Sequence, residues 1–136
     1  QTLILDDFPP PDLARCLSPN GRANWRAKRR AKIDVTTVVW AQINRLGQPL
    51  TPIPSPAHVT YRWIVPDRRH RDLDNHGTGV VKVVQDYLVT YGILPGGDHV
   101  GALTSQVEIV YEKGQRRLEI ILEPAGQPAP DEEVLG

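Results

Sequence analysis

Apolar residues recur every three or four positions between residues 22 and 46, and this long pattern constrains the fold more than any other feature. Such spacing places apolar side chains along one face of an α-helix. Residues 33–39 are rich in β-branched side chains, which favour a strand, but their apolar positions do not alternate as a half-buried strand requires. We therefore predict a long helix that ends at Gly47. Its buried face would consist of Ala31, Val35, Val38, Val39, Ile43 and Leu46.

Three other segments have a clear apolar pattern. Residues 2–5 and 59–65 are apolar runs typical of strands, and the proline-rich segment 48–56 separates the second run from the long helix. Residues 80–91 have a helical period and precede Gly92, a residue type that commonly follows the end of a helix. These segments predict a strand on each side of the long helix and a second helix after them.

Near the C-terminal end, residues 100–111 and 116–122 alternate apolar and polar side chains around Lys113-Gly114. We predict that these two segments pair with each other as a β-hairpin. The order β-α-β-α-β-β then predicts an α/β (α+β) single domain, in which a mixed sheet of about four strands has two helices packed on it. We expect the domain to span residues 1–123 and the acidic, proline-rich tail 124–136 to fray.

Length and composition fit one globular domain. The chain has 136 residues, of which 40% are hydrophobic and 24% are charged. No apolar run approaches the roughly 18 residues that span a membrane, and no signal-peptide pattern opens the sequence. The single cysteine, Cys16, excludes an internal disulfide and fits a reducing compartment. We therefore expect a cytoplasmic protein with no membrane partner. We also expect no small-molecule cofactor.

Two carboxylates follow the second predicted strand, within the sequence Asp67-Arg68-Arg69-His70-Arg71-Asp72-Leu73-Asp74-Asn75. In an extended backbone, the side chains of Asp72 and Asp74 point the same way. Such carboxylates repel each other unless a proton or cation lies between them, and Mg²⁺ is commonly held by one or two carboxylates. The residues before them that are candidates for phosphate binding are Arg68, Arg69 and Arg71.

This motif points to metal-assisted phosphodiester chemistry, with carboxylates for the metal and arginines for phosphate. The alternative is a solvated loop in which the same arginines and aspartates pair with one another.

Basic residues cluster in one part of the chain although the formal net charge is zero. Residues 21–49 carry seven Lys or Arg residues against one acid, Asp34, whereas the last thirteen residues carry three acids and no base. Overall neutrality therefore argues only weakly against DNA binding. The candidates for DNA contact in this basic segment are Arg22, Arg26, Lys28 and Arg29.

Three sequence blocks, which together cover most of residues 8–123, carry a family resemblance. The first is Pro9-Pro10-Pro11, followed by Leu17-Ser18-Pro19-Asn20-Gly21-Arg22 and Trp25-Arg26-Ala27-Lys28. The second is Arg71-Asp72-Leu73-Asp74-Asn75. The third is Lys82-Val83-Val84-Gln85-Asp86-Tyr87-Leu88, followed by Tyr91-Gly92-Ile93-Leu94. In this order and spacing the blocks resemble those of the RusA family of Holliday-junction resolvases, small endodeoxyribonucleases common in phages and prophages.

The resemblance implies a homodimeric, Mg²⁺-dependent nuclease, with Mn²⁺ as a substitute metal. Such an enzyme binds four-way DNA junctions and resolves them by paired symmetric nicks in DNA recombination and repair, in a bacterial or phage-infected cell. The resemblance assigns Asp72 and Asp74 as catalytic, metal-binding carboxylates and Lys82 as the catalytic helix lysine. The third such carboxylate maps to Asp98, in a loop where Gly96-Gly97 replace the family's adjacent aspartates.

Simpler roles remain open for several of these residues. Lys82 lies four positions before Asp86, a spacing at which a helix forms ion pairs. Asp98 follows two glycines, where an acid commonly stabilises a turn or caps a helix. Trp25 and Trp63 are candidates for stacking on bases of an opened junction, with burial in the core as the alternative.

Two other functions are open as hypotheses. Gly96-Gly97 favour a branched-DNA binding protein whose cleavage activity is impaired. A Mg²⁺ phosphohydrolase acting on a small phosphate ester is disfavoured, because the chain is short of glycine-rich phosphate loops at a helix start and because its first helix is basic.

Overall fold

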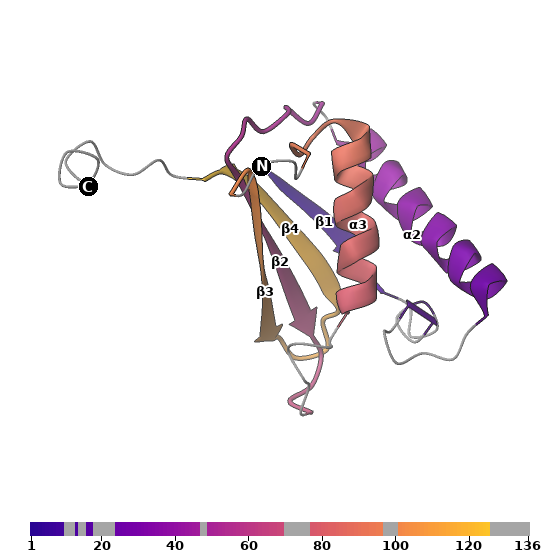
Figure 1. Cartoon of the computed structure of the whole chain (residues 1–136). Coiled ribbons are helices and arrows are strands. Elements are labelled where there is room, and N and C mark those ends of the chain that lie inside the picture. Colours follow the sequence, from indigo (N-terminus) through magenta and orange to yellow (C-terminus); the bar gives the residue numbers. More distant parts are fainter. Residues whose placement is uncertain are drawn as a thin grey trace.

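A computed structural model describes residues 1–9, 13, 16–17, 24–46, 49–69, 77–96 and 101–125 of the chain. Within them, four strands form one mixed sheet and two long helices pack on it (Figure 1). The elements are β1 (Thr2–Asp6), α2 (Trp25–Arg45), β2 (Ala57–Val65), α3 (Thr78–Tyr91), β3 (Leu103–Tyr111) and β4 (Arg117–Pro124). The predicted fold class and the order β-α-β-α-β-β are confirmed.

Helix α2 is slightly shorter than its apolar pattern. Asn24 caps its start, because the side-chain Oδ1 accepts a hydrogen bond from the Ala27 N–H at 2.9 Å. The helix ends at Arg45, where the Leu46 N–H donates to the Ile43 carbonyl at 3.2 Å. The predicted apolar stripe is confirmed: Ala31, Val35, Val39 and Ile43 are buried, and Val38 and Leu46 pack partly buried against the core.

The predicted hairpin between the last two strands is wrong. The order across the sheet is β1-β4-β2-β3, so β2 lies between β3 and β4. It pairs in parallel with β3 and antiparallel with β4, and Trp63 therefore has Ile109 on one side and Leu118 on the other. The physical reason is that alternation reports which face of a strand is buried but not which strand lies beside it. As the most continuously buried strand, β2 takes a central position.

The short connection between β3 and β4 crosses the end of β2. The Glu112 N–H donates to the Val65 carbonyl at 3.0 Å, and the Gly114 N–H donates to the Pro66 carbonyl at 3.2 Å. Gly114 has a φ of 73°, a left-handed conformation that glycine adopts at little cost. Residues 112–116 therefore reach over one strand instead of folding back between neighbours.

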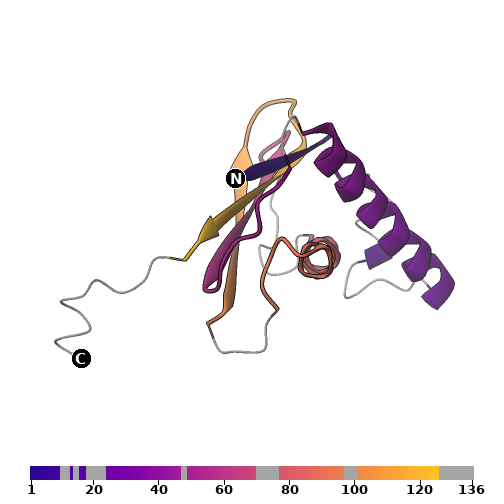
Figure 2. The same ribbon diagram turned by 90° about the horizontal axis from the view of Figure 1, so that it is seen from above.

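Both helices lie on the same side of the sheet (Figure 2). Alternate strand residues face them and form the core with the buried faces of α2 and α3. Trp63 is only 1% exposed, which confirms the core alternative for this residue, whereas Trp25 is 66% exposed. Gly92, with a φ of 94°, follows the last residue of α3, as predicted. None of the helices in the described ranges has the length and apolar character to cross a membrane.

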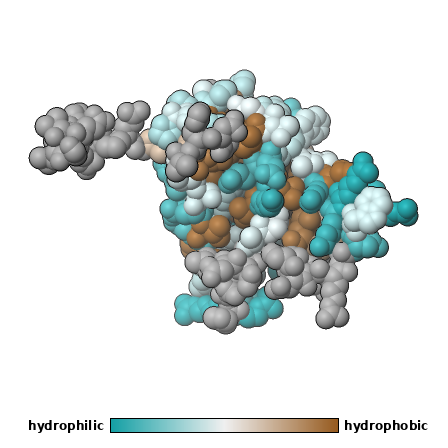
Figure 3. Space-filling view, viewed as in Figure 1, coloured by the Kyte–Doolittle hydropathy of each residue, from teal (hydrophilic) through white to brown (hydrophobic). Residues whose placement is uncertain are grey.

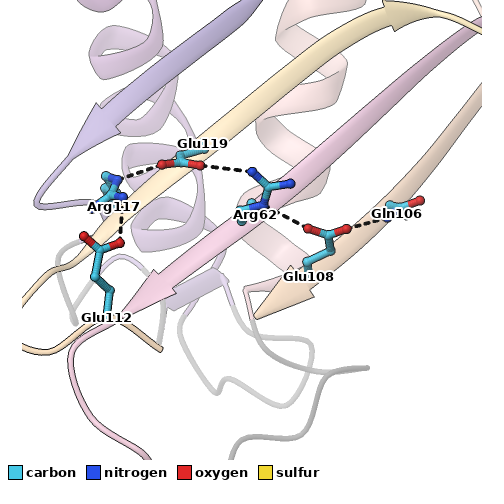
Figure 4. Close-up of polar contacts among 6 residues, drawn as sticks. All are labelled: Arg62, Gln106, Glu108, Glu112, Arg117 and Glu119. Atoms are coloured by element: carbon cyan, nitrogen blue, oxygen red, sulfur yellow. Dashed lines mark hydrogen bonds and ion pairs between the residues drawn. The ribbon is translucent and has the colours of Figure 1, made fainter. Parts of the chain in front are cut away.

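An ion-pair network occupies the sheet face that points away from the helices (Figure 4). Arg62 Nε lies 2.9 Å from Glu108 Oε2 on β3, and Arg62 Nη1 lies 3.5 Å from Glu119 Oε1 on β4. Arg117 extends the network by contacting Glu119 at 2.8 Å and Glu112 at 2.9 Å. The hydrogen bond from Arg62 holds the pKa of the Glu108 carboxyl below its ordinary value.

The last strand, β4, ends at the first residue of the predicted tail 124–136. Pro124 is the last residue of β4, and the Ala125 N–H donates to the Pro56 carbonyl at 2.8 Å. Residues 126–136 lie outside the described part of the chain.

Candidate functional site

Helices α2 and α3 pack against each other and leave a groove of about 460 Å³ between them. Both helices run in the same general direction, so both begin at the same end of the groove (Figure 1). Hydrophilic side chains gather over the beginning of α2, at the right of the space-filling view (Figure 3). The groove is therefore the place where the basic segment of the sequence meets the second helix.

Two stripes of polar side chains line the groove, one from each helix. Residues four apart on a helix lie on the same face, one turn above another. The stripes each follow this spacing twice and consist of Lys28, Lys32 and Thr36 on α2, and of Lys82, Asp86 and Thr90 on α3. Among the described residues that line the groove, three thus carry an ammonium group and one carries a carboxylate.

Apolar groups form the rest of the wall. Val83 and Tyr87 of α3 line the groove together with Leu17. A Cβ on Gly79 would overlap the Leu17 carbonyl, so the chain at Leu17 lies directly on the first turn of α3. The ring of Tyr87 also packs against Tyr91, with 5.8 Å between the ring centroids. The groove therefore combines a basic rim with an apolar wall.

Lys82 reaches the groove as an exposed side chain. Among the ion pairs of the described residues, none joins Lys82 to Asp86, although the two are four positions apart. Asp86 lies close enough to the phenol of Tyr61 for its charge to add to the effect of burial, and both raise the pKa of Tyr61. The Tyr61 hydroxyl donates to Gln85 Oε1 at 3.0 Å.

Arg68 and Arg69, the two arginines after β2 that the structure describes, are not among the residues that line this groove and have partners of their own. The Arg68 guanidinium lies over the Tyr111 ring, 4.7 Å from its centroid. The Arg69 N–H donates to Asp67 Oδ1 at 3.0 Å, and Arg69 Nε lies 3.9 Å from the same oxygen. An arginine–aspartate pair of the kind expected for a solvated loop is therefore present here, and phosphate binding by these arginines stays a prediction.

The basic residues at the beginning of α2 point in different directions. Lys28 lines the groove, whereas the Arg26 guanidinium lies over the Trp25 ring at 5.4 Å from its centroid. Arg29 is exposed, and Arg30 pairs with Asp34 at 3.5 Å. Positive charge thus extends from the groove over the neighbouring surface of α2.

Several predicted site residues lie outside the described residues, namely Arg22, Arg71, Asp72, Asp74 and Asp98. The described ranges themselves contain no group of three His, Cys, Asp or Glu side chains placed to hold a metal ion. The metal-binding role of the three aspartates is therefore a hypothesis from the sequence alone.

Lys32 and Tyr87 were not among the residues predicted as sites. Their signal is present in the sequence, because Lys32 continues the spacing of Lys28 and Tyr87 follows Asp86 on the helix that carries Lys82. That signal acquires a meaning only when α2 and α3 are known to face each other.

Comparisons of the chain with protein-family models and with curated proteins gave no match. The class of ligand is therefore inferred from the side chains that line the groove. Clustered ammonium groups favour a phosphate ester, and the apolar wall favours a ligand that also has an apolar face.

Proposed function

We propose that this protein is a Mg²⁺-dependent, structure-specific endodeoxyribonuclease that resolves four-way DNA junctions by paired symmetric nicks. The observation that carries the proposal is that Lys28 and Lys82 line the same groove. Lys28 was predicted as a DNA contact and Lys82 as a catalytic lysine from separate blocks of the sequence. Their proximity supports a common phosphodiester ligand.

The described residues have definite roles in this proposal. The exposed ammonium of Lys82 stabilises negative charge on the scissile phosphate. Lys28 and Lys32 bind phosphates beside it, and the exposed Arg29 extends the contact along the DNA backbone.

The proposed metal ligands are Asp72, Asp74 and Asp98, a set of oxygen donors that suits Mg²⁺, or Mn²⁺ as a substitute. These carboxylates would hold the metal ion, which would supply a water molecule of lowered pKa and positive charge beside the phosphate. Asp72 and Asp74 belong to the segment 66–77, which connects the end of β2 to the start of α3, the helix that carries Lys82.

The active form in this proposal is a homodimer in the cytoplasm of a bacterial or phage-infected cell. A four-way junction needs two cuts related by a two-fold axis, and a two-fold dimer supplies two sites in that relation. No membrane partner and no small-molecule cofactor take part.

A direct test incubates the protein and Mg²⁺ with a synthetic four-way junction and, separately, with a linear duplex of matched sequence. We expect paired nicks in the junction alone. Equal cutting of both substrates would contradict junction specificity, and neither binding nor cutting would contradict the proposal as a whole.

The second candidate is a branched-DNA binding protein with impaired cleavage. The observation that favours it is Gly96-Gly97, which stands where an acidic pair would complete the metal site. In the same test this protein would shift the junction in a gel, more weakly as salt rises, and would not cut it with Mg²⁺ or Mn²⁺.

A further inference from the structure

We propose that the groove between α2 and α3 holds one nucleotide of an unpaired DNA strand, with its phosphate among the lysines and its base against the Tyr87 wall. This inference rests on the proposed function, because it specifies which form of DNA the same site takes.

The size of the groove favours a single unpaired nucleotide over a DNA duplex. Its volume of about 460 Å³ falls within the usual range of small-ligand pockets, roughly 300–1,000 Å³. A duplex presents its phosphates on the outside of a rod and keeps its bases inside, so it would contact the rim and leave the wall empty. An unpaired nucleotide can place both its phosphate and its base inside the groove.

The wall is suited to a base. The Tyr87 ring lines the groove next to Val83, and aromatic rings are the usual platforms for bases of single-stranded DNA. A pocket for a free phosphate ion would gain nothing from an apolar wall of this kind.

The polar groups orient the nucleotide. Lys28, Lys32 and Lys82 attract the phosphate, whereas the Asp86 carboxylate repels it. Thr36 already donates its hydroxyl hydrogen to the Ile33 carbonyl at 2.9 Å, so its oxygen is left as an acceptor. Acceptors beside the aromatic wall suit a base with an exocyclic amino group, such as cytosine.

The test measures equilibrium binding without catalysis, in EDTA, by the fluorescence anisotropy of a labelled single-stranded hexadeoxycytidylate. We expect Tyr87→Leu to weaken binding by about tenfold, in line with the loss of one stacked base. Lys32→Ala should weaken it severalfold. The control Lys113→Ala removes the same charge from the exposed β3–β4 connection and should change binding by less than about twofold.

Two further arms keep the inference falsifiable if Tyr87→Leu does not fold. Tyr87→Phe keeps the ring and should bind like wild type, and an abasic hexamer with the same phosphates should bind about tenfold more weakly than the hexadeoxycytidylate. Equal binding of the two hexamers, or equal competition by a blunt duplex, would overturn the inference.

The outcomes separate this inference from the proposed function. If wild-type protein cuts the junction but binds the two hexamers equally, the nucleotide pocket is wrong and the resolvase proposal stands. If the hexamer binds in a Tyr87-dependent way but the junction is neither bound nor cut, the pocket stands and the resolvase proposal is wrong.

Discussion

Gly77 packs against the indole ring of Trp63, where the start of α3 meets the last part of β2. A Cβ on Gly77 would overlap Trp63 Cζ2, and Gly77 has a φ of 66°. Both the available space and the backbone conformation therefore require glycine. The contact joins β2 and α3, and Asp72 and Asp74 belong to the segment 66–77 that connects these two elements.

Replacing this glycine should cost more than backbone strain alone. We expect Gly77→Ala to lower the free energy of unfolding by about 2 kcal/mol or more, measured by urea denaturation. Gly114→Ala is the matched control, because Gly114 has a similar φ of 73° but nothing lies within 4 Å of an added Cβ. If the two variants lost the same free energy of unfolding, the contact with Trp63 would add nothing to the cost of replacing Gly77.

Asp72→Asn and Asp74→Asn should each abolish junction cleavage while junction binding stays the same or tightens. Each change removes a metal ligand and also removes a negative charge facing phosphate. The measurements are cleavage with Mg²⁺ and a gel shift in EDTA. Cutting at the wild-type rate by either variant would refute its role as a metal ligand.

Asp98→Asn tests the carboxylate in the glycine-bearing loop. If Asp98 is the third ligand, cleavage should fall as far as in Asp72→Asn, and raised Mg²⁺ should partly restore it because metal affinity is what has been lost. A melting curve matched to wild type excludes a folding defect. Normal cutting would remove Asp98 from the site and favour the binding-only candidate.

The basic surface of α2 should contribute to affinity through phosphate contacts. Replacing Arg26, Lys28 and Arg29 with alanine should weaken binding to all branched substrates and reduce the slope of log affinity against log salt by about 1 per lost contact. The measurement is junction affinity at several salt concentrations. An unchanged slope would show that these side chains make no phosphate contacts.

The Arg62–Glu108 pair should make stability depend on pH on the acid side. The folded pKa of Glu108 is depressed, so its stabilising effect is full above the unfolded pKa and is lost as pH falls through the folded one. We expect the fall in Tm from neutral pH to about pH 3 to be smaller in Glu108→Gln than in wild type. Glu123→Gln, an exposed change elsewhere on the sheet, should follow the wild-type curve.

Much of the fold could be predicted because local spacing records burial. The buried positions of α2 follow from Ala31, Val35 and Val39, and the end of α3 follows from Gly92. The neighbours of β3 and β4 could not be predicted in this way. Strand order depends on which apolar segment becomes central. Here β2, which lies far from β3 and β4 in the sequence, takes the place between them and prevents them from pairing with each other.

The candidate site was predicted only in part. Lys28 and Lys82 were identified from separate sequence blocks, but nothing local relates them, because more than fifty residues separate them in the chain. Lys32 and Tyr87 became candidates only through the packing of α2 against α3. The carboxylates Asp72, Asp74 and Asp98 were identified by residue type and spacing. They lie outside the described residues, so their role stays a prediction.

The position of β2 between β3 and β4 has a consequence for how the protein is made. The last two strands cannot form an independent hairpin and join the sheet afterwards, because β2 has to occupy the space between them. In addition, β1 pairs with β4, the strand that comes last along the chain, and Thr2 lies opposite Ile121. During synthesis the first strand therefore has to wait for its partner until β4 has left the ribosome, and sheets joined over such sequence distances assemble late and slowly.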